Sequence, residues 1–190
     1  MNKSEMYDEL YITQPHRWGD DNGRDAFVSD NIPQPKSVLD IGCGHGHTLE
    51  HLSKVWPGTE LYGVDISPVA IEMAKKKVDA TFFVGTIDDL DIKVDVATLL
   101  GVAEHFENLD ELGRVKNLLN DDGLVYIEVP NCLSYRPGPK SFRGGGVQTE
   151  WHLPRDEWER KIKEQGYNII KEITGKKVTW EFIWILKENK

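Results

Sequence analysis

Glycines and acidic side chains are the first residues of this 190-residue chain whose spacing could support chemistry. Gly42, Gly44 and Gly46 occupy alternate positions directly after the apolar segment 38–41. Residues without a β-carbon let a ligand approach the backbone, and a helix that starts there points free N–H groups at it. Asp65 ends a second apolar segment, where its carboxylate could accept hydrogen bonds from two sugar hydroxyls. This pattern favours a nucleotide-like ligand.

Histidines provide the candidates for proton transfer, because imidazole is the side chain best matched to neutral pH. His105 follows the apolar segment 94–100, where it could act as a general base or could orient a neighbouring loop. His152 is a second general-base candidate, after the glycine- and proline-rich segment 131–150. The two cysteines lack the spacing of a metal site, and we predict no metal.

A series of strands and helices must position these residues. Apolar segments alternate with helical patterns four times, with short connections, which predicts an α/β fold with a doubly wound, mostly parallel sheet. The carboxyl ends of such strands meet at one edge, where ligands bind. Two further strands, joined by a short connection at 174–177, predict an antiparallel hairpin at the C-terminus. The seven expected strands are 38–41, 61–64, 81–84, 94–100, 124–129, 167–173 and 178–186.

The composition limits the classes of partner. The chain is 39% hydrophobic and 29% charged, as expected for a globular domain. Its net charge of −9 makes binding to a nucleic-acid backbone unlikely to be its role. No apolar segment has the length of a signal peptide core or a membrane span, so we expect a cytoplasmic protein without membrane insertion.

The glycine turn was compared with three nucleotide-binding patterns. A phosphate-binding P-loop needs a lysine after its glycines, and none follows Gly46. The dinucleotide fingerprint needs a third glycine at the position of His47, so an NAD(P)-dependent oxidoreductase fits poorly.

The third pattern matches along the chain. Five segments resemble, in order, the motifs of the class I (Rossmann-like) S-adenosylmethionine (SAM)-dependent methyltransferases, over roughly residues 36–131. Among these enzymes the chain looks closest to the small-molecule methyltransferases of ubiquinone and menaquinone biosynthesis. The resemblance implies a Rossmann-like sheet and SAM as the cofactor, with S-adenosylhomocysteine (SAH) as its product. The five segments are 38–46, 63–67, 83–90, 95–105 and 119–131.

The resemblance also implies roles for single residues. Asp65 would bind the ribose hydroxyls, although an aspartate here could instead cap the next helix. Gly42 and Gly44 would let the backbone approach the methionine portion and the sugar. Asp40, inside a strand, would order the turn and the methionine ammonium. Arg24 would lie near the methionine carboxylate, or it could be a solvated surface arginine.

The adenine part of the site departs from the family. Thr86 stands where relatives have an acid that receives the adenine amino group. Adenine could be held by the Thr86 side chain and the Ile87 backbone N–H, or by Asp88 reaching back. Ile66, after the second strand, and Leu100, at the end of the fourth, complete the predicted cofactor site.

One domain, 1–190, is expected, and its parts differ in predicted role. The segment 131–150 carries Arg136 and Arg143, so it could close as a lid on an anionic or aromatic acceptor. It could also be a solvated loop. The parts are an N-terminal lead-in or cap (1–36), a SAM-binding core (37–130), a substrate lid loop (131–153), and a C-terminal helix and hairpin (154–190).

The predicted function is methyl transfer from SAM to a small-molecule acceptor, at oxygen. The fourth strand ends in Leu100-Gly101 without the Asn/Asp-Pro-Pro-aromatic sequence of enzymes that methylate amino groups of bases, so a nucleic-acid substrate is not expected. A non-catalytic module that binds SAM or SAH remains the alternative, since binding motifs predict binding in both cases. An NAD(P)-dependent oxidoreductase is the less favoured third hypothesis.

Overall fold

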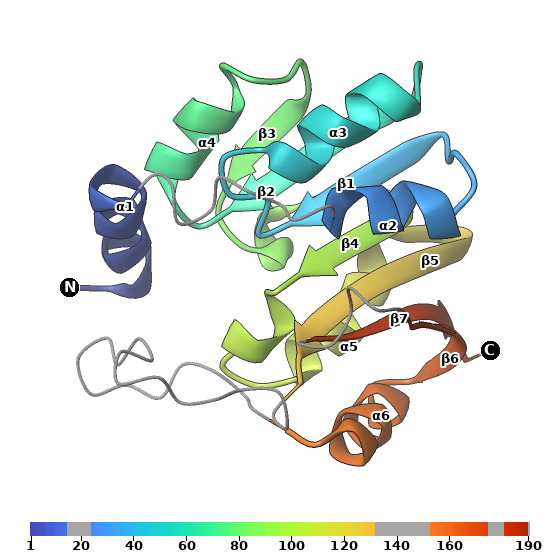
Figure 1. Ribbon diagram of the computed structural model, residues 1–190. Coiled ribbons are helices and arrows are strands. Elements are labelled where there is room, and N and C mark those ends of the chain that lie inside the picture. The colour runs from blue at the N-terminus through green and yellow to red at the C-terminus, as the bar shows by residue number, and fades with distance from the viewer. Residues whose placement is uncertain (15–23, 132–152, 175–180, 190) are drawn as a thin grey trace.

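The computed structural model describes residues 1–14, 24–131, 153–174 and 181–189. Its centre is a seven-stranded sheet with helices packed on both faces (Figure 1). The strands are β1 (Ser37–Ile41), β2 (Glu60–Asp65), β3 (Thr81–Val84), β4 (Val94–Leu100), β5 (Leu119–Pro130), β6 (Tyr167–Ile173) and β7 (Glu181–Glu188).

Helices precede, connect and follow these strands. The α-helices are α1 (Lys3–Thr13), α2 (Arg24–Asn31), α3 (His47–Val55), α4 (Pro68–Ala74), α5 (Asp110–Arg114) and α6 (Arg155–Glu164). Three short 3₁₀ helices are η2 (Ile87–Asp89), η3 (Ala103–His105) and η4 (Val115–Leu118). In Figure 1, α1 lies beside α4, apart from the other helices.

The sheet order is β3-β2-β1-β4-β5-β7-β6, so the chain runs outward from β1 on one side and then returns to β4 on the other. Strands β1 to β5 are parallel, and β7 is antiparallel to both β5 and β6. The predicted α/β fold, with seven strands, a mostly parallel sheet and an antiparallel C-terminal strand, is confirmed. The order reverses between β1 and β4, which is the point where ligands bind in open α/β sheets.

Two details around β5 differ from the prediction. The strand expected over 124–129 begins at Leu119, directly after α5 and the 3₁₀ helix η4. Residues 120–123 loop out inside β5 between two paired positions, and Asp122 has a φ of 63°. A glycine at 113 weakens the helix, while the pairing of Leu119 with Val94 extends the strand.

Hydrophobic side chains form one core on each face of the sheet. Leu39 packs into a core with α5 and α6, whereas its neighbour Val38 packs into a core with α2 and α3. Such alternation follows from the two-residue period of a strand. The two cores hold the sheet rigidly, so its carboxyl edge can position a site.

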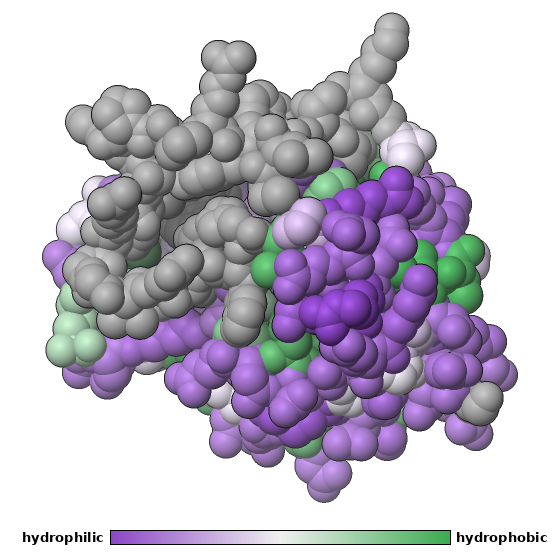
Figure 2. All heavy atoms as spheres, turned by 90° about the horizontal axis from the view of Figure 1, so that it is seen from below, coloured by the Kyte–Doolittle hydropathy of each residue, from purple (hydrophilic) through white to green (hydrophobic). Residues whose placement is uncertain are grey.

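Polar side chains cover most of the described surface on the face seen from below. Figure 2 shows this face, mainly hydrophilic with hydrophobic groups in small separate areas. Within the described ranges, no helix has both the length and the apolar character needed to cross a membrane. The predicted lid, with His152, lies outside the described residues except at its ends, as does most of the connection predicted at 174–177.

Candidate functional site

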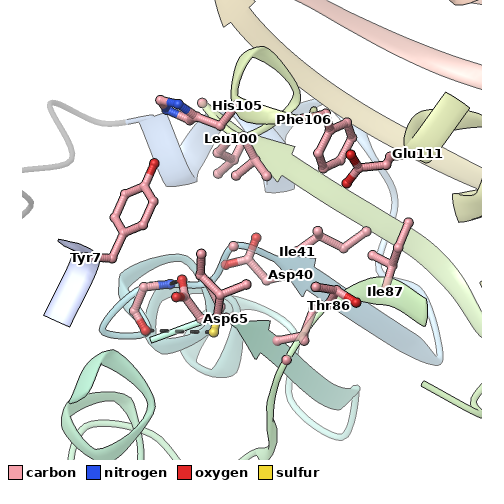
Figure 3. Close-up of a pocket in the computed structure, with 18 of the residues that line it drawn as sticks. Tyr7, Asp40, Ile41, Asp65, Thr86, Ile87, Leu100, His105, Phe106 and Glu111 are labelled. Carbon is pink, nitrogen blue, oxygen red and sulfur yellow. Dashed lines mark hydrogen bonds between the residues drawn. The ribbon is translucent and has the colours of Figure 1, made fainter. Parts of the chain in front are cut away.

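A pocket of about 510 Å³ lies at the carboxyl ends of β1, β2 and β4 (Figure 3). Its volume is in the range of small-molecule sites, about 300–1,000 Å³. The pocket brings together His105 and all but one of the predicted cofactor residues. These residues are Asp40, Gly42, Gly44, Asp65, Ile66, Thr86, Ile87, Asp88 and Leu100.

The glycine turn after β1 forms one wall of the pocket. Gly42 and Gly44 have φ values of +66° and +51°, a region that side chains disfavour. A β-carbon on Gly42 would lie 2.5 Å from Val102 Cγ2, and one on Gly44 would lie 2.7 Å from the Tyr11 hydroxyl oxygen. The turn therefore needs glycine for both its conformation and its space, and it presents bare backbone to the pocket.

Asp65 is buried at the end of β2, directly beside this turn. Its two carboxylate oxygens accept hydrogen bonds at 2.9 Å from the backbone N–H groups of Gly44 and Ser67. Burial raises the pKa of Asp65, and these two N–H groups oppose that rise. A carboxylate offers about four acceptor positions. Asp65 can therefore accept two more hydrogen bonds from a pair of ligand hydroxyls.

Asp40 is buried on β1, near the carboxyl edge of the sheet. It lies opposite Thr98 of β4, whose hydroxyl donates to Asp40 Oδ1 at 2.6 Å. Burying an aspartate inside a strand is costly without such a donor. Thr98 thus holds the Asp40 carboxylate where it lines the pocket.

The adenine end of the predicted site is formed by η2. The Thr86 hydroxyl donates to Asp89 Oδ2 at 3.0 Å and accepts from the Asp88 N–H at 3.3 Å. Arg114 of α5 binds the Asp88 carboxylate with two hydrogen bonds, at 2.8 and 3.1 Å. The Thr86 side chain, the Asp88 side chain and the Ile87 N–H were the three groups predicted to hold adenine. The first two already have hydrogen-bond partners within the protein. The Ile87 N–H lies in the first turn of η2, where backbone N–H groups have no acceptor within the helix.

His105, the first predicted general base, lies on the opposite side of the pocket on η3. It is half-buried, and its ring packs edge-on against Tyr7 at 6.2 Å between ring centroids. Phe106 and Glu111 line the pocket nearby (Figure 3). The side of the pocket opposite the cofactor turn therefore combines an imidazole with aromatic and acidic groups.

The N-terminal helix α1 contributes pocket residues that the sequence analysis missed. Lys3, Tyr7 and Tyr11 all line the pocket. Their spacing of four residues places them on one helix face, which is a signal that could have been noticed. Burial raises the pKa of Tyr11, so its phenol stays protonated and can donate a hydrogen bond.

Histidines border the glycine turn. The His45 and His47 rings pack at 4.3 Å, and Lys77 lies 3.4 Å from His47 Nε2. Burial, with lesser contributions from Lys77 and His47, lowers the pKa of His45 to about 4. His45 is therefore neutral at neutral pH and does not add a positive charge to the turn.

Arg24 is the predicted residue whose position is least defined. It is the first residue of α2, and its side chain is not among the described ones, so its role stays a prediction. The next residue, Asp25, does line the pocket and accepts a hydrogen bond at 2.8 Å from the Thr48 hydroxyl. Among the described residues, no cluster of three acidic, histidine or cysteine side chains could hold a metal ion.

Comparison with known proteins identifies the family of this site. Residues 20–172 match a family model described as a methyltransferase domain. The chain belongs to this methyltransferase family. The match covers the β1 turn, Asp65 and His105, whereas the pocket residues of α1 lie before it.

Curated relatives of the chain include trans-aconitate 2-methyltransferases. One from Mycolicibacterium gilvum is 29% identical over 158 residues, which are 77% of this chain and 58% of the relative. Another from Rhodopseudomonas palustris is 26% identical over 139 residues, 67% of this chain and 51% of the relative. The chain thus spans about half the length of the curated relatives it matches.

Solved structures share the fold of this methyltransferase at low identity. A protein described as a methyltransferase, in complex with the Haloferax volcanii Trm112 methyltransferase activator, aligns over 100% of both chains with a TM-score of 0.82 and 15% identity. The Burkholderia thailandensis 1,6-didemethyltoxoflavin-N1-methyltransferase, solved with its namesake ligand and SAH, aligns over 98% of this chain and 87% of its own, with a TM-score of 0.75 and 16% identity. These likenesses establish the Rossmann-like methyltransferase fold.

The described residues fit SAM, the cofactor implied by the family. The turn at Gly42 and Gly44 lines the pocket, and Asp65 retains acceptor positions beside it. Ile87 of the η2 turn and the buried Asp40 line the same pocket. The absence of a metal remains a prediction.

Proposed function

We propose that this protein transfers the methyl group of SAM to an oxygen of a small-molecule acceptor. The observation that carries the proposal is the buried Asp65 carboxylate, fixed by the Gly44 and Ser67 N–H groups in the wall of one pocket with His105. Family membership supports the reaction type, and the pocket volume supports a small acceptor.

The chain's own residues bind and align the cofactor in this proposal. Asp65 accepts hydrogen bonds from the ribose hydroxyls, and the bare turn at Gly44 accommodates the methionine portion. The Ile87 N–H binds an adenine ring nitrogen, since the Thr86 and Asp88 side chains are already bonded within the protein. When bound, SAM supplies an activated methyl group, so alignment and exclusion of water are the main tasks left to the protein.

The acceptor side holds the residues that act on the nucleophile. His105 accepts the proton of an acceptor hydroxyl as the methyl group is transferred, which imidazole does well near neutral pH. For a carboxylate acceptor no proton is removed, and His105 then acts as a hydrogen-bond donor. The names of the relatives favour trans-aconitate as a first acceptor to test, and the resemblance to ubiquinone- and menaquinone-type enzymes favours a quinol as a second.

Cofactor binding is the first test. Calorimetry with SAH and with NAD on the purified protein should give a complex with SAH only, and Asp65→Asn should weaken it. Asp79→Asn is the matched control, because Asp79 is exposed and does not line the pocket. Absence of SAH binding by the unchanged protein would refute the proposal, and binding of NAD instead would favour an oxidoreductase.

Turnover is the second test. Transfer of labelled methyl from SAM is measured with trans-aconitate, soluble hydroquinones and a panel of small hydroxy and carboxylic acids. A product methylated at oxygen, with transfer reduced in His105→Ala, is the expected result. Tight SAH binding with no transfer across the panel would favour a non-catalytic SAM- or SAH-binding module.

A further inference from the structure

The helix α1 presents two different rows of side chains to the rest of the protein. Lys3, Tyr7 and Tyr11 are spaced by four residues and line the pocket. Ser4 and Asp8, also four apart, form the neighbouring row. Residues at this spacing lie on one face of a helix, so each row has one direction.

The row of Ser4 and Asp8 fixes α1 to the end of β2. The Ser4 hydroxyl donates to the Ile66 carbonyl at 2.7 Å. Asp8 Oδ1 accepts hydrogen bonds from the Ser67 hydroxyl at 2.5 Å and from the Val69 N–H at 3.3 Å. Because these contacts fix one row of α1, they also fix the direction of the row formed by Lys3, Tyr7 and Tyr11. Leu10 and Tyr11 are the buried residues of α1.

The pocket row of α1 spans both halves of the site. Tyr11 lies over the cofactor turn, where its hydroxyl would meet a β-carbon placed on Gly44. Tyr7 is one turn earlier, about 6 Å along the helix axis. This step carries Tyr7 away from the cofactor turn and toward the side of the pocket with His105 and Leu100 (Figure 3).

Two contacts join α1 to His105. The Tyr7 and His105 rings meet edge-on, with 84° between their planes and 6.2 Å between centroids. Lys3 Nζ donates to the His105 carbonyl oxygen at 2.5 Å. Figure 3 shows the Tyr7 side chain directed toward the His105 imidazole. The 3₁₀ helix that carries His105 has three residues and no side-chain cap, so contacts from α1 matter for its orientation.

We propose that Tyr7 is a positioning residue, whose ring holds the His105 imidazole in the orientation that methyl transfer requires. The inference rests on the proposed function and adds a residue from the N-terminal helix to the acceptor site. The contact described is between the two rings, so the proposal expects Tyr7→Phe to keep the role and Tyr7→Leu to lose it.

The test compares Tyr7→Phe with Tyr7→Leu in the full chain. Imidazole proton resonances of His105, assigned with His105→Gln, are recorded by NMR with and without SAH. They should move in Tyr7→Leu by more than the loss of the Tyr7 ring current accounts for, and stay near their wild-type positions in Tyr7→Phe. With the acceptor from the turnover screen, Tyr7→Leu should lower kcat by about 10- to 100-fold, the size expected for a misplaced catalytic group.

Three measurements separate orientation from simple damage. The affinity for SAH should stay within about twofold in both Tyr7 variants, because cofactor contacts are kept. Ile12→Ala, at an exposed position of α1, should leave the resonances and kcat unchanged. Circular dichroism and thermal unfolding identify any variant that fails to fold, and Tyr7→Phe then still reports on the ring.

The outcomes distinguish the two proposals. His105 resonances that do not move in Tyr7→Leu would overturn the positioning role without any knowledge of the acceptor. Normal SAH binding and normal kcat in Tyr7→Leu would likewise overturn it and leave the proposed function standing. A wild-type protein that binds no SAH would overturn the proposed function and the inference that rests on it.

Discussion

Replacement of Asp65 by asparagine tests the cofactor site most directly. The substitution keeps the shape of the side chain and removes its charge. The amide has one acceptor oxygen and an NH2 group in place of the two carboxylate oxygens that accept from Gly44 and Ser67. Each ribose hydroxyl therefore loses a charged acceptor, at a cost of at least about 1–1.5 kcal/mol, the difference between charged and neutral hydrogen bonds. The total of about 2–3 kcal/mol corresponds to SAH binding that is roughly 30- to 150-fold weaker.

The pH dependence of binding adds a second readout. Burial raises the pKa of Asp65, and ribose hydroxyls bind its ionised form. The SAH affinity of the wild type should therefore fall as the pH falls through this raised pKa, because a protonated Asp65 must lose its proton before SAH binds. In Asp65→Asn, which has nothing to titrate at this position, the same fall should be absent.

Isothermal calorimetry at pH 5 to 8 measures both effects, and thermal unfolding shows whether the variant is folded. The exposed Asp79→Asn variant is the control for a lost negative charge. A folded Asp65→Asn protein that binds SAH as tightly as the wild type would refute the assignment of Asp65 to the ribose. Weaker binding with an unchanged pH profile would refute only the role given to its ionisation.

Three further predictions concern neighbouring residues. Gly44→Ala should weaken SAH binding at least about tenfold. A β-carbon there would lie 2.7 Å from the Tyr11 hydroxyl, and the φ of +51° adds strain of about 1 kcal/mol. An unchanged SAH affinity in calorimetry would contradict this close approach between residue 44 and Tyr11. Thr98→Val should lower the free energy of unfolding in urea by about 1.5–3 kcal/mol, since buried Asp40 loses its donor at 2.6 Å, and an unchanged midpoint would show that Asp40 is satisfied otherwise. Burial lowers the pKa of His45 from 6.5 to about 4, so between these values only the unfolded chain takes up the proton and stability falls with falling pH. His45→Gln should lose less Tm between pH 6.5 and 4.5 than the wild type, and an equal loss would exclude His45 as the cause.

Local patterns were sufficient to predict the sheet and one wall of the pocket. Gly42, Gly44 and Asp65 each stand directly after a short apolar strand, so residue type and position in the chain define where they lie. Parallel strands then bring their carboxyl ends together without further information. The doubly wound, mostly parallel sheet and the antiparallel β7 agree with this prediction.

Contacts between distant segments could not be predicted in the same way. Arg114 binds Asp88 across 26 residues, and this pair occupies a carboxylate that had been considered for adenine. Tyr7 and Tyr11 reach the pocket only because Ser4 and Asp8 bond to the end of β2, about 60 residues later. No periodicity within the helix reveals such partners, since they depend on tertiary docking.

Ser67 lies between two equilibria, the binding of a ligand at Asp65 and the docking of α1. Its N–H binds Asp65, its hydroxyl donates to Asp8, and the same oxygen caps α4 by accepting from the Ala70 N–H. If a ligand that bonds to Asp65 strengthens the docking of α1 through Ser67, thermodynamic reciprocity requires that the docking of α1 strengthen ligand binding by the same factor. Substitutions on the outer surface of α1 that alter its docking should consequently change cofactor affinity without touching the ligand.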